Sequence, residues 1–426
     1  MAVTGAPHHS RRLDPVGRNA VTELAFTRGG EMPRADENAS VAMSMPAGRS
    51  EQVRRWTING DFLALAPTGI ARYAREVTWA LDALLEERHP LTSELRVELV
   101  TAREPDEAFR LSNIAYRVVP EATRPRLPQA WVQFQLPRQA PGGLLSFCNL
   151  APIGHRHHIA CIHDVQTRVA PESYTAPFRL MHRVIMPLVG RFAARIVTVS
   201  GGSRDHLVQF GIAPRRKIVV AHNGGDHALR WRPEKARLNW QRERPFVFCI
   251  GRPQAHKNPE LIWQLASLLE KHGIDVVVAG DIDPDASDLP RMPRPSNLEL
   301  IGRIADDDVA AALSAALCFA LPSRTEGFGL PAVEAMSLGC PVIASTAPAL
   351  PEVCAEGAIY ADPEAPAAWA QAVMSLAGDP GLRERLRDAG RSRAGGFTWR
   401  KVAETYLALM QEMDDERRLG LRTGRR

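Results

Sequence analysis

The 426-residue sequence predicts an α/β protein with two doubly wound parallel sheets in tandem. Short β-rich runs alternate with helical stretches, which is typical of parallel sheets covered by helices. This alternation occurs twice, on either side of a polar stretch at 229–244 that is rich in Arg and Trp. The length also suits two or three domains of about 100 to 200 residues each.

The first series of elements begins near Trp56, after a leader of different composition. Residues 1–50 are rich in Arg, Pro, Gly, Ser and Ala without apolar periodicity. We expect them to be a disordered leader, or part of an over-long gene start. A strand-like run at 56–63, a Pro-Thr-Gly turn and an amphipathic stretch at 70–85 then predict strand, turn and helix. Further strands are expected at 96–101, 144–148, 159–162, 196–199 and 218–221.

The second series follows the polar stretch. Its strands are expected at 246–250, 276–279, 298–301, 316–321, 342–344 and 358–360. Two such sheets normally face each other across a cleft, and ligands bind at the carboxyl ends of the strands. The predicted domain boundaries are 1–50 for the leader, 51–228 and 229–397 for the two sheets, and 398–426 for the C-terminal segment.

Composition excludes several classes of protein. With 45% hydrophobic and 24% charged residues the chain is not a collagen, a coiled coil or a disordered tail. The uncharged, apolar-rich stretch at 309–323 has 15 residues, whereas a transmembrane helix needs about 18 to 20. The six cysteines form no C-x-x-C pair and no signal peptide opens the chain. Reduced, buried thiols in a cytosolic protein are therefore expected.

The basic charge is concentrated in the first half of the chain. Residues 101–250 contain 22 basic and 10 acidic residues, a balance of +12, whereas 251–350 contain 7 and 13, a balance of −6. A basic half favours a phosphate-bearing ligand, an anionic membrane surface or nucleic acid, with plain solubility as the alternative. Nucleic acid is least favoured because aromatic residues for base stacking are sparse there.

The most specific segment is 326–334, Glu-Gly-Phe-Gly-Leu-Pro-Ala-Val-Glu, which follows a predicted strand. Its two glycines let the backbone approach a ligand closely, and Pro331 suits the first turn of a helix. The start of that helix is an anion site, because its N–H groups are free. Glu326 and Glu334 can flank one pocket and bind sugar hydroxyls. Alternatively, Glu326 is solvated and Glu334 caps or pairs on a helix surface.

This segment also resembles the motifs of two other functions. Gly327-x-Gly329-x-x-Ala332 fits a dinucleotide fingerprint, but residues 322–326 separate it from its strand and the unit lies late in the chain. We reject the fingerprint and keep a nicotinamide-dependent oxidoreductase as the alternative function. The two carboxylates also look like an acid/base pair for glycoside hydrolysis.

Two cations follow the strand at 246–250. Gly251 and Arg252 come directly after it, and Lys257, one of only five lysines, follows in the same loop. Together they can place two positive charges against a diphosphate. For either residue alone, a surface position would be the better interpretation.

In the first half, His163 follows the strand at 159–162, where it can hydrogen-bond a sugar or a reacting group. Histidines at 155, 157 and 158 could be metal ligands. However, no carboxylate or Cys lies at ligand spacing from them, so no metal is expected.

Two further turns lie at predicted helix starts. The turn at Gly69 suits an acceptor or phosphate contact. The segment 200–204 contains a helix N-cap, for which Ser203 is the better candidate.

In this order, the motifs resemble the retaining GT-B glycosyltransferases of glycosyltransferase family 4. The resemblance runs from about Trp56 to the C-terminus. It rests on Thr-Gly-Ile-Ala-Arg-Tyr at 68–73, His-Asp at 163–164, Val-Ser-Gly-Gly-Ser-Arg at 199–204, Asn-Gly at 223–224, Gly-Arg at 251–252, Lys-Asn at 257–258, 326–334 and Gly-Cys-Pro-Val-Ile at 339–343. Ala71 departs from the family's common Gly-Ile-Gly-Arg-Tyr form.

The resemblance implies a GT-B fold, in which two Rossmann-like domains face each other and the second binds most of a nucleotide-sugar donor. A C-terminal helix at 398–413 would cross back to the first domain. Arg252 and Lys257 would hold the donor diphosphate and stabilise the leaving group. Glu326 and the N–H groups after it would hold the donor sugar.

By the same resemblance Glu334 would bind the ribose hydroxyls, His163 would contact the donor sugar from the opposite domain, and Gly69 would approach the phosphates. The predicted catalytic set is His163, Arg252, Lys257 and Glu326. The predicted donor-binding set is Gly69, Gly251, Gly327, Phe328, Gly329, Leu330 and Glu334.

The function implied is a retaining, metal-independent hexosyltransferase without a cofactor. It would act in bacterial exopolysaccharide or lipopolysaccharide synthesis, in the cytoplasm or on the inner face of the cell membrane, with an anionic membrane as contact partner and no nucleic acid. Mannose from GDP-mannose is the first expectation, followed by glucose, galactose or rhamnose, and the acceptor would be lipid-linked or an oligosaccharide. A non-catalytic sugar-nucleotide-binding relative is a further alternative, which the retained Glu326, Glu334, Arg252 and Lys257 disfavour.

Overall fold

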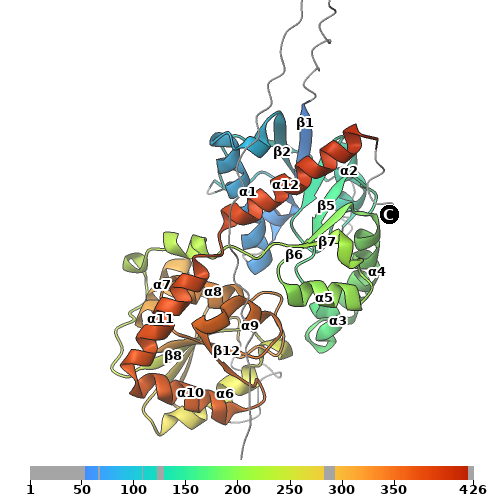
Figure 1. Cartoon of the computed structure of the whole chain (residues 1–426). Helices are drawn as coiled ribbons and strands as arrows, with labels where there is room; N and C mark the ends of the chain where they lie inside the picture. The colour runs from blue at the N-terminus through green and yellow to red at the C-terminus, as the bar shows by residue number, and fades with distance from the viewer. Residues whose placement is uncertain (1–52, 66–67, 108, 122–128, 283–292, 421–426) are drawn as a thin grey trace, which may run out of the picture. The chain divides into compact units, whose positions relative to one another are not determined.

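The structure, a computed structural model, describes residues 53–65, 68–107, 109–121, 129–282 and 293–420. The predicted leader at 1–50 lies outside these residues. Two parallel sheets covered by helices follow one another along the chain (Figure 1). The predicted fold class is therefore confirmed.

The first sheet has seven strands, all parallel, in the order β3-β2-β1-β4-β5-β6-β7. Its strands are β1 (Arg54–Asn59), β2 (Leu95–Thr101), β3 (Ala115–Val118), β4 (Gly143–Ser146), β5 (His158–Cys161), β6 (Arg195–Thr198) and β7 (Ile218–Val220). Its helices are α1 (Gly69–Glu86), α2 (Leu136–Gln139), α3 (Gln166–Val169), α4 (Ala176–Phe192) and α5 (Gly201–Gln209).

The second sheet has six strands, also all parallel, in the order β10-β9-β8-β11-β12-β13. Its strands are β8 (Phe246–Gly251), β9 (Asp275–Gly280), β10 (Leu298–Gly302), β11 (Cys318–Leu321), β12 (Val342–Ser345) and β13 (Ala358–Ala361). The helices that follow them are α6 (Pro259–Glu270), α7 (Asp306–Ala315), α8 (Leu330–Ser337), α9 (Ala349–Cys354), α10 (Pro366–Gly378), α11 (Pro380–Ala394) and α12 (Trp399–Arg418).

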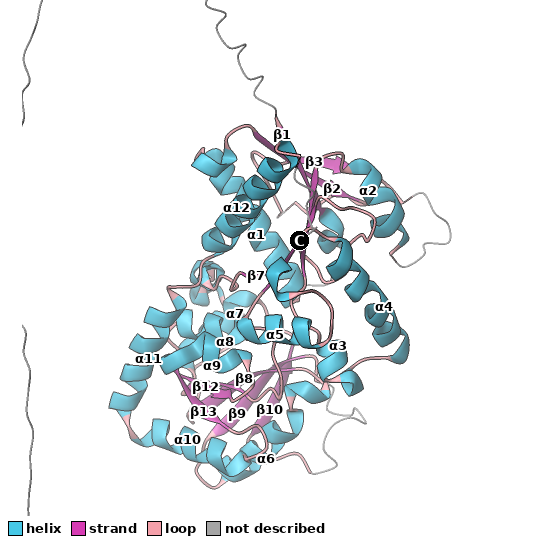
Figure 2. Cartoon of the chain, turned by 45° about the vertical axis from the view of Figure 1, so that its right-hand side comes forward, coloured by secondary structure: helices cyan, strands magenta, loops and turns pink. Residues whose placement is uncertain are grey.

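Helices cover both faces of the second sheet, with α6 and α10 on one side and α8 and α9 on the other (Figure 2). Alternate residues of β8 point to opposite faces of the sheet. Val247 and Cys249 pack with α6 and α10, whereas Phe246 and Phe248 pack with α8. Burial on both faces explains why these strands are continuous apolar runs in the sequence.

Short one-turn helices connect the longer elements. They are η1 (Gly60–Ala64), η2 (Pro90–Thr92), η3 (Trp131–Gln135), η4 (Pro171–Ser173), η5 (Arg215–Lys217), η6 (Asp226–Arg230), η7 (Pro233–Lys235), η8 (Ala255–Lys257) and η9 (Ala355–Gly357). Two of them, η6 and η8, carry residues of the candidate site.

The structure corrects three local expectations. The run at 56–63 is a strand only as far as Asn59, and η1 takes up the remainder. Strand β3 was not predicted, because it lies at the edge of its sheet and none of its residues is buried. The N-cap of α5 is Ser200 and not Ser203, since the chain is still extended at Ser200 directly after β6 and its hydroxyl accepts the Ser203 N–H.

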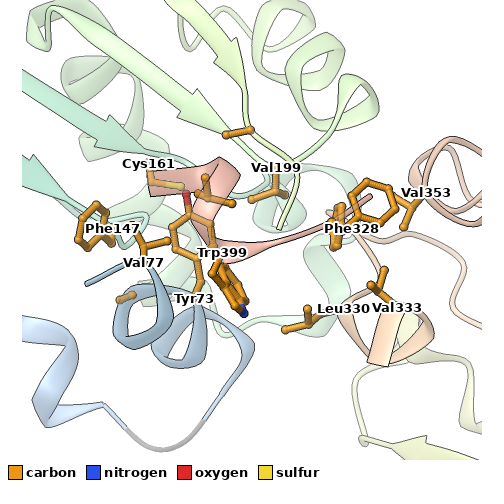
Figure 3. Close-up of a cluster of buried hydrophobic side chains, with 14 of the residues drawn as sticks. Tyr73, Val77, Phe147, Cys161, Val199, Phe328, Leu330, Val333, Val353 and Trp399 are labelled. Atoms are coloured by element: carbon orange, nitrogen blue, oxygen red, sulfur yellow. The ribbon is translucent and has the colours of Figure 1, made fainter. Parts of the chain in front are cut away.

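Helix α12 joins the second sheet region to the first. Thr398 is its N-cap, and Asp414, near its end, accepts hydrogen bonds from Arg54 at 2.7 Å and Trp56 at 2.9 Å. Buried side chains of both sheets form one apolar cluster around the start of this helix, where Trp399 lies beside Tyr73 (Figure 3).

Among the described residues, no helix is both long enough and apolar enough to cross a membrane. All six cysteines are free, and all except the half-buried Cys148 are buried. The predicted burial of the thiols therefore holds for five of the six cysteines.

Candidate functional site

The glycine bend, residues 326–331, joins β11 to α8 at the carboxyl end of the second sheet. Gly329 is the N-cap of α8 with a φ of +92°, a conformation that favours glycine, and Pro331 lies in the first turn as predicted. The free N–H groups of this turn make the start of α8 favourable for an anion.

The bend touches the first half of the chain. A Cβ added to Gly327 would stand 3.0 Å from Asp164 Oδ2. The Gly327 carbonyl accepts hydrogen bonds from the hydroxyls of Ser200 at 2.6 Å and Ser203 at 3.0 Å. Nearby, Gln166 donates to the Thr325 hydroxyl at 3.3 Å. The carboxyl ends of the two sheets therefore meet at this bend.

The structure brings Lys257 and Glu326 together. Lys257 Nζ lies 2.6 Å from Glu326 Oε1, and the Ser323 hydroxyl donates to the same oxygen at 2.6 Å. Burial raises the pKa of Glu326, but the charge and hydrogen bond of Lys257, together with Ser323, outweigh it and hold that pKa below its usual value. Glu326 is therefore a paired, buried anion and not the solvated carboxylate of the alternative interpretation.

Asp164 has the opposite electrostatic environment. Burial raises the pKa of Asp164, and the charge of Glu326 raises it further. A hydrogen bond from the Gln166 backbone and the charge of Lys257 lower it, but the net effect is a raised pKa. The pKa values of the two neighbouring carboxyl groups are thus moved in opposite directions. Such a separation lets one group stay ionised while the other holds a proton more readily.

Arg252 is not brought into contact with the glycine bend. Its side chain makes no hydrogen bond or ion pair with the residues that the structure describes. Its charge nevertheless opposes the rise that burial, Asp164 and Glu326 cause in the pKa of Tyr174. Arg252 therefore belongs to the same electrostatic environment as the two carboxylates without touching them.

His256 lies between these groups and the first half. Its ring nitrogen Nδ1 is 2.9 Å from the Ser173 hydroxyl, and its ring stacks on Tyr174. Burial, followed by the charge of Lys257, lowers the pKa of His256 to about 4. The neutral ring adds no positive charge beside Lys257 at physiological pH.

His163 is buried at the end of β5 next to the bend. Its Nε2 is 2.8 Å from the Phe147 carbonyl, which can only accept, so the ring proton lies on Nε2. The ring packs edge-on against Tyr73 with centroids 4.6 Å apart. His163 thus lies in the predicted place, directly beside Asp164.

Four predicted donor-binding residues have different local environments. A Cβ on Gly69, the first residue of α1, would meet nothing within 4 Å, so open space surrounds it. A Cβ on Gly251 would stand 2.4 Å from Ile282 and 2.6 Å from Val278 of β9, so the packing around it already requires glycine there. Phe328 and Leu330 are buried, and their side chains belong to the apolar cluster.

Glu334 is buried and paired, not exposed on a helix surface. His227 Nε2 lies 2.8 Å from Glu334 Oε1, and Arg72 Nε lies 3.9 Å from the same oxygen. Trp399 Nε1 is 3.0 Å from His227 Nδ1. Neither His227 nor Trp399 was predicted as a site residue, because each is more than 60 positions from Glu334 along the chain.

A cavity of about 730 Å³ adjoins this group. It runs along α1 beside η6, and Arg72, His227 and Trp399 are part of its wall. Arg72 forms an ion pair at 2.7 Å with Asp306, which also lines the cavity. Two of the lining residues, His227 and Arg72, approach the Glu334 carboxylate.

The three histidines that suggested a metal site each have a partner in the protein. His155 contacts the Ala140 carbonyl, His157 contacts Asp414, and His158 contacts the Ser146 hydroxyl. Within the described part of the chain, no group of three or more His, Cys, Asp or Glu residues could hold a metal ion.

The sequence profile described as glycosyl transferases group 1 matches residues 232–393. The matched region, residues 232–393, belongs to this family. The matched region contains Arg252, Lys257, Glu326 and Glu334.

Curated relatives carry related names at moderate identity. The D-inositol 3-phosphate glycosyltransferase of Segniliparus rotundus is 28% identical over 282 residues, covering 60% of this chain and 62% of that protein. The O-antigen chain mannosyltransferase B of Escherichia coli is 28% identical over 257 residues, covering 57% and 66%. The chain thus spans less than two thirds of the length of these relatives.

Solved structures of this architecture extend over more of the chain. Sucrose-phosphate synthase of Thermosynechococcus elongatus superposes with a TM-score of 0.62 at 18% identity, covering 85% of this chain and 99% of that one. HepE of Anabaena, in complex with UDP-glucose, superposes with a TM-score of 0.58 at 15% identity, covering 84% and 99%. With its seven-stranded and six-stranded parallel sheets, the chain has the GT-B fold.

Proposed function

We propose that the chain is a retaining glycosyltransferase, which transfers a hexose from a nucleotide-diphosphate sugar to a lipid-linked or oligosaccharide acceptor. The observation that carries this proposal is the Lys257–Glu326 ion pair beside the glycine bend, opposite His163 and Asp164 of the first half. An acceptor-side domain at 51–228 and a donor domain at 229–397 would enclose the reacting groups, with 398–426 crossing back.

The charges of the site suit cleavage of a sugar–diphosphate bond. The bond from the sugar C1 to the phosphate oxygen breaks, and its electron pair leaves with the nucleoside diphosphate. Lys257, Arg252 and the N–H groups at the start of α8 would stabilise the charge that develops there. No step requires the protein to donate a proton to the leaving oxygen.

The acceptor would attack from the face on which the leaving group departs. Its hydroxyl oxygen forms the new bond to C1, and its proton passes to the departing phosphate oxygen, so that configuration is retained. Glu326, ionised because of its lowered pKa, would accept hydrogen bonds from hydroxyls of the donor sugar. His163, Gly69 and the N–H groups of residues 327–329 would complete the donor site.

Mannose from GDP-mannose is the first donor that we propose, and surface polysaccharide synthesis is the proposed setting. An E. coli relative named as an O-antigen chain mannosyltransferase supports both points. Other donors are also tested, because one relative is named as an inositol-phosphate glycosyltransferase and one structural neighbour is bound to UDP-glucose.

The test is a thermal-shift panel of GDP- and UDP-sugars, followed by a transfer assay with the stabilising donor and assignment of the product anomer by NMR. Glu326→Ala is expected to lower kcat about 100- to 1000-fold. Glu87→Ala is the matched control, because Glu87 also pairs with a cation but is half-exposed. Near-normal turnover of Glu326→Ala, or stabilisation by a nicotinamide cofactor and no nucleotide sugar, would overturn the proposal.

We also infer contact with an anionic membrane on the inner face of the cell membrane. Helix α4 contains Arg179, Arg183 and Arg191 without a carboxylate, and it exposes Leu180 and Val184 one turn apart. A basic helix with exposed apolar residues suits the interface of anionic lipids. Leu180→Ser/Val184→Ser should reduce co-flotation with phosphatidylglycerol vesicles, whereas Leu229→Ser, an equally exposed leucine on η6, should not. Equal flotation of the two variants would refute this inference.

A further inference from the structure

We propose that His227 is a positioning residue, which holds one oxygen of Glu334 and leaves the other for the hydroxyls of a bound nucleotide. This inference rests on the proposed function, in which Glu334 binds the ribose. It goes further by assigning the orientation of that carboxylate to the linker η6 and to the first residue of α12.

The direction of the hydrogen bonds is fixed by chemistry. An indole N–H can only donate, so Trp399 Nε1 donates to His227 Nδ1 across 3.0 Å. The proton of the His227 ring must then lie on Nε2, which donates to Glu334 Oε1 across 2.8 Å. Trp399 therefore selects the tautomer of His227 that can hold Glu334.

Burial makes this chain of contacts specific. His227 is 1% exposed, Trp399 2% and Glu334 6%. A polar group at this depth is costly without a partner, so each hydrogen bond constrains the orientation of the groups that it joins. The rings of His227 and Trp399 also pack together, with centroids 5.7 Å apart.

The second oxygen of Glu334 is available. Oε2 accepts no hydrogen bond from any residue that the structure describes, and Arg72 also approaches from the side of Oε1. His227 and Arg72 both line the 730 Å³ cavity beside α1. A buried carboxylate with one anchored and one open oxygen suits a ligand that donates from neighbouring hydroxyls.

The same place is where the two chain segments that link the halves meet. The Gly225 N–H donates to the Phe397 carbonyl at 3.0 Å, and the Trp399 N–H donates to Asp226 at 3.0 Å. A Cβ on Gly224 would stand 2.3 Å from the Trp399 nitrogen, so the segments could not pack this closely with another residue there. The orientation of Glu334 is thus tied to the crossing of these segments.

The decisive experiment compares two polar variants of similar size. His227→Asn keeps an acceptor near Nδ1 for Trp399 but cannot reach Glu334, whereas His227→Gln places an amide N–H close to the position of Nε2. Binding of GDP and of 2′,3′-dideoxy-GDP is measured by calorimetry for each variant, with the uridine pair used in parallel. The ratio of the two affinities reports recognition of the ribose hydroxyls, and general loosening of the fold cancels from it.

Wild type is expected to prefer GDP about tenfold, the value of one to two hydrogen bonds to a charged acceptor. His227→Asn should lose this preference, and His227→Gln should keep most of it. His272→Asn, at an exposed histidine after α6, is the control and should match wild type. With a saturating acceptor, His227→Asn should raise the KM for the donor and change kcat little.

Three results would overturn the inference. A wild-type preference in His227→Asn would show that the ring does not position Glu334. Equal loss in the Asn and Gln variants, with unchanged melting temperatures, would show that the ring only fills space. An unchanged preference in Glu334→Ala would remove the proposed ribose contact as well, and only that last result counts against the proposed function.

Discussion

Replacing Lys257 with Met tests the centre of the proposed site. The substitution removes the ammonium group 2.6 Å from Glu326 and keeps a side chain of similar length. Glu326 is 10% exposed and Lys257 25%, so the carboxylate remains buried without its cation. Ser323 would be the remaining hydrogen-bond donor to that oxygen.

The expected losses differ for activity and stability. Loss of one preorganised charge at the leaving group should lower kcat about 100- to 1000-fold. An uncompensated buried carboxylate costs about 3 to 5 kcal/mol, and the partial exposure of Lys257 reduces this to about 2 to 3 kcal/mol. For a domain of this size the melting temperature should fall by roughly 4 to 12 °C.

The loss of stability in Lys257→Met should depend on pH. In wild type the pKa of Glu326 is lowered by folding, so the ion pair stabilises above the unfolded pKa and is lost as pH falls through the folded value. In Lys257→Met burial is opposed mainly by Ser323, so the pKa of Glu326 rises. Its destabilising charge is then neutralised as the pH falls. The gap in melting temperature should therefore narrow between about pH 7.5 and pH 4.5.

The assay is a transfer time course with the donor chosen by the panel, together with melting curves at both pH values. Lys271→Met, at an exposed lysine after α6, is the matched control. The double variant Lys257→Met/Glu326→Gln should recover part of the stability and none of the activity. A kcat within threefold of wild type, or a stability gap that stays constant with pH, would refute the reasoning.

Two further substitutions test contacts between the halves. Gly327→Ala places a Cβ 3.0 Å from Asp164, so donor affinity should fall about tenfold, whereas Gly378→Ala, whose Cβ would meet nothing within 4 Å, should leave calorimetric binding unchanged. Glu352 accepts from the Gly201 and Gly202 N–H groups and contacts His222. Burial raises its pKa, but these bonds outweigh burial and lower it, so Glu352→Gln should cost about 1 kcal/mol at neutral pH, and this cost should shrink as the pH falls through the lowered pKa. Denaturant unfolding at neutral and at acidic pH checks this, and Glu352→Gln matching wild type at neutral pH would refute it.

The sequence analysis assigned Lys257 and Glu326 to one donor site, and the sheet topology explains why the two residues lie together. Strands β8 and β11 are adjacent and parallel, with Cys318 paired to Val247. Loops that leave the carboxyl ends of adjacent parallel strands lie side by side. The cation after β8 and the carboxylate after β11 therefore meet at a common edge, although the sequence alone did not show that the two strands are neighbours.

Other features could not be predicted from sequence. Strand β3 carries no apolar run, because a sheet edge buries little of it. The pairing of Glu334 with His227 depends on how η6 lies against α8, and no local pattern encodes that distance. Similarly, Ser200 and Ser203 both lie near the start of α5, and the sequence does not show which of them is the N-cap. The extended backbone at Ser200 identifies it as the cap in the structure.

Helix α12 connects the geometry of the site to the first sheet. At one end Trp399 fixes the tautomer of His227 and thereby the carboxylate of Glu334. At the other end Asp414 holds Arg54 and Trp56 of β1. A 20-residue helix is about 30 Å long, so α12 links two contacts that lie far apart in the molecule. The ribose contact that we propose for Glu334 and the packing of α12 against β1 therefore depend on the same helix.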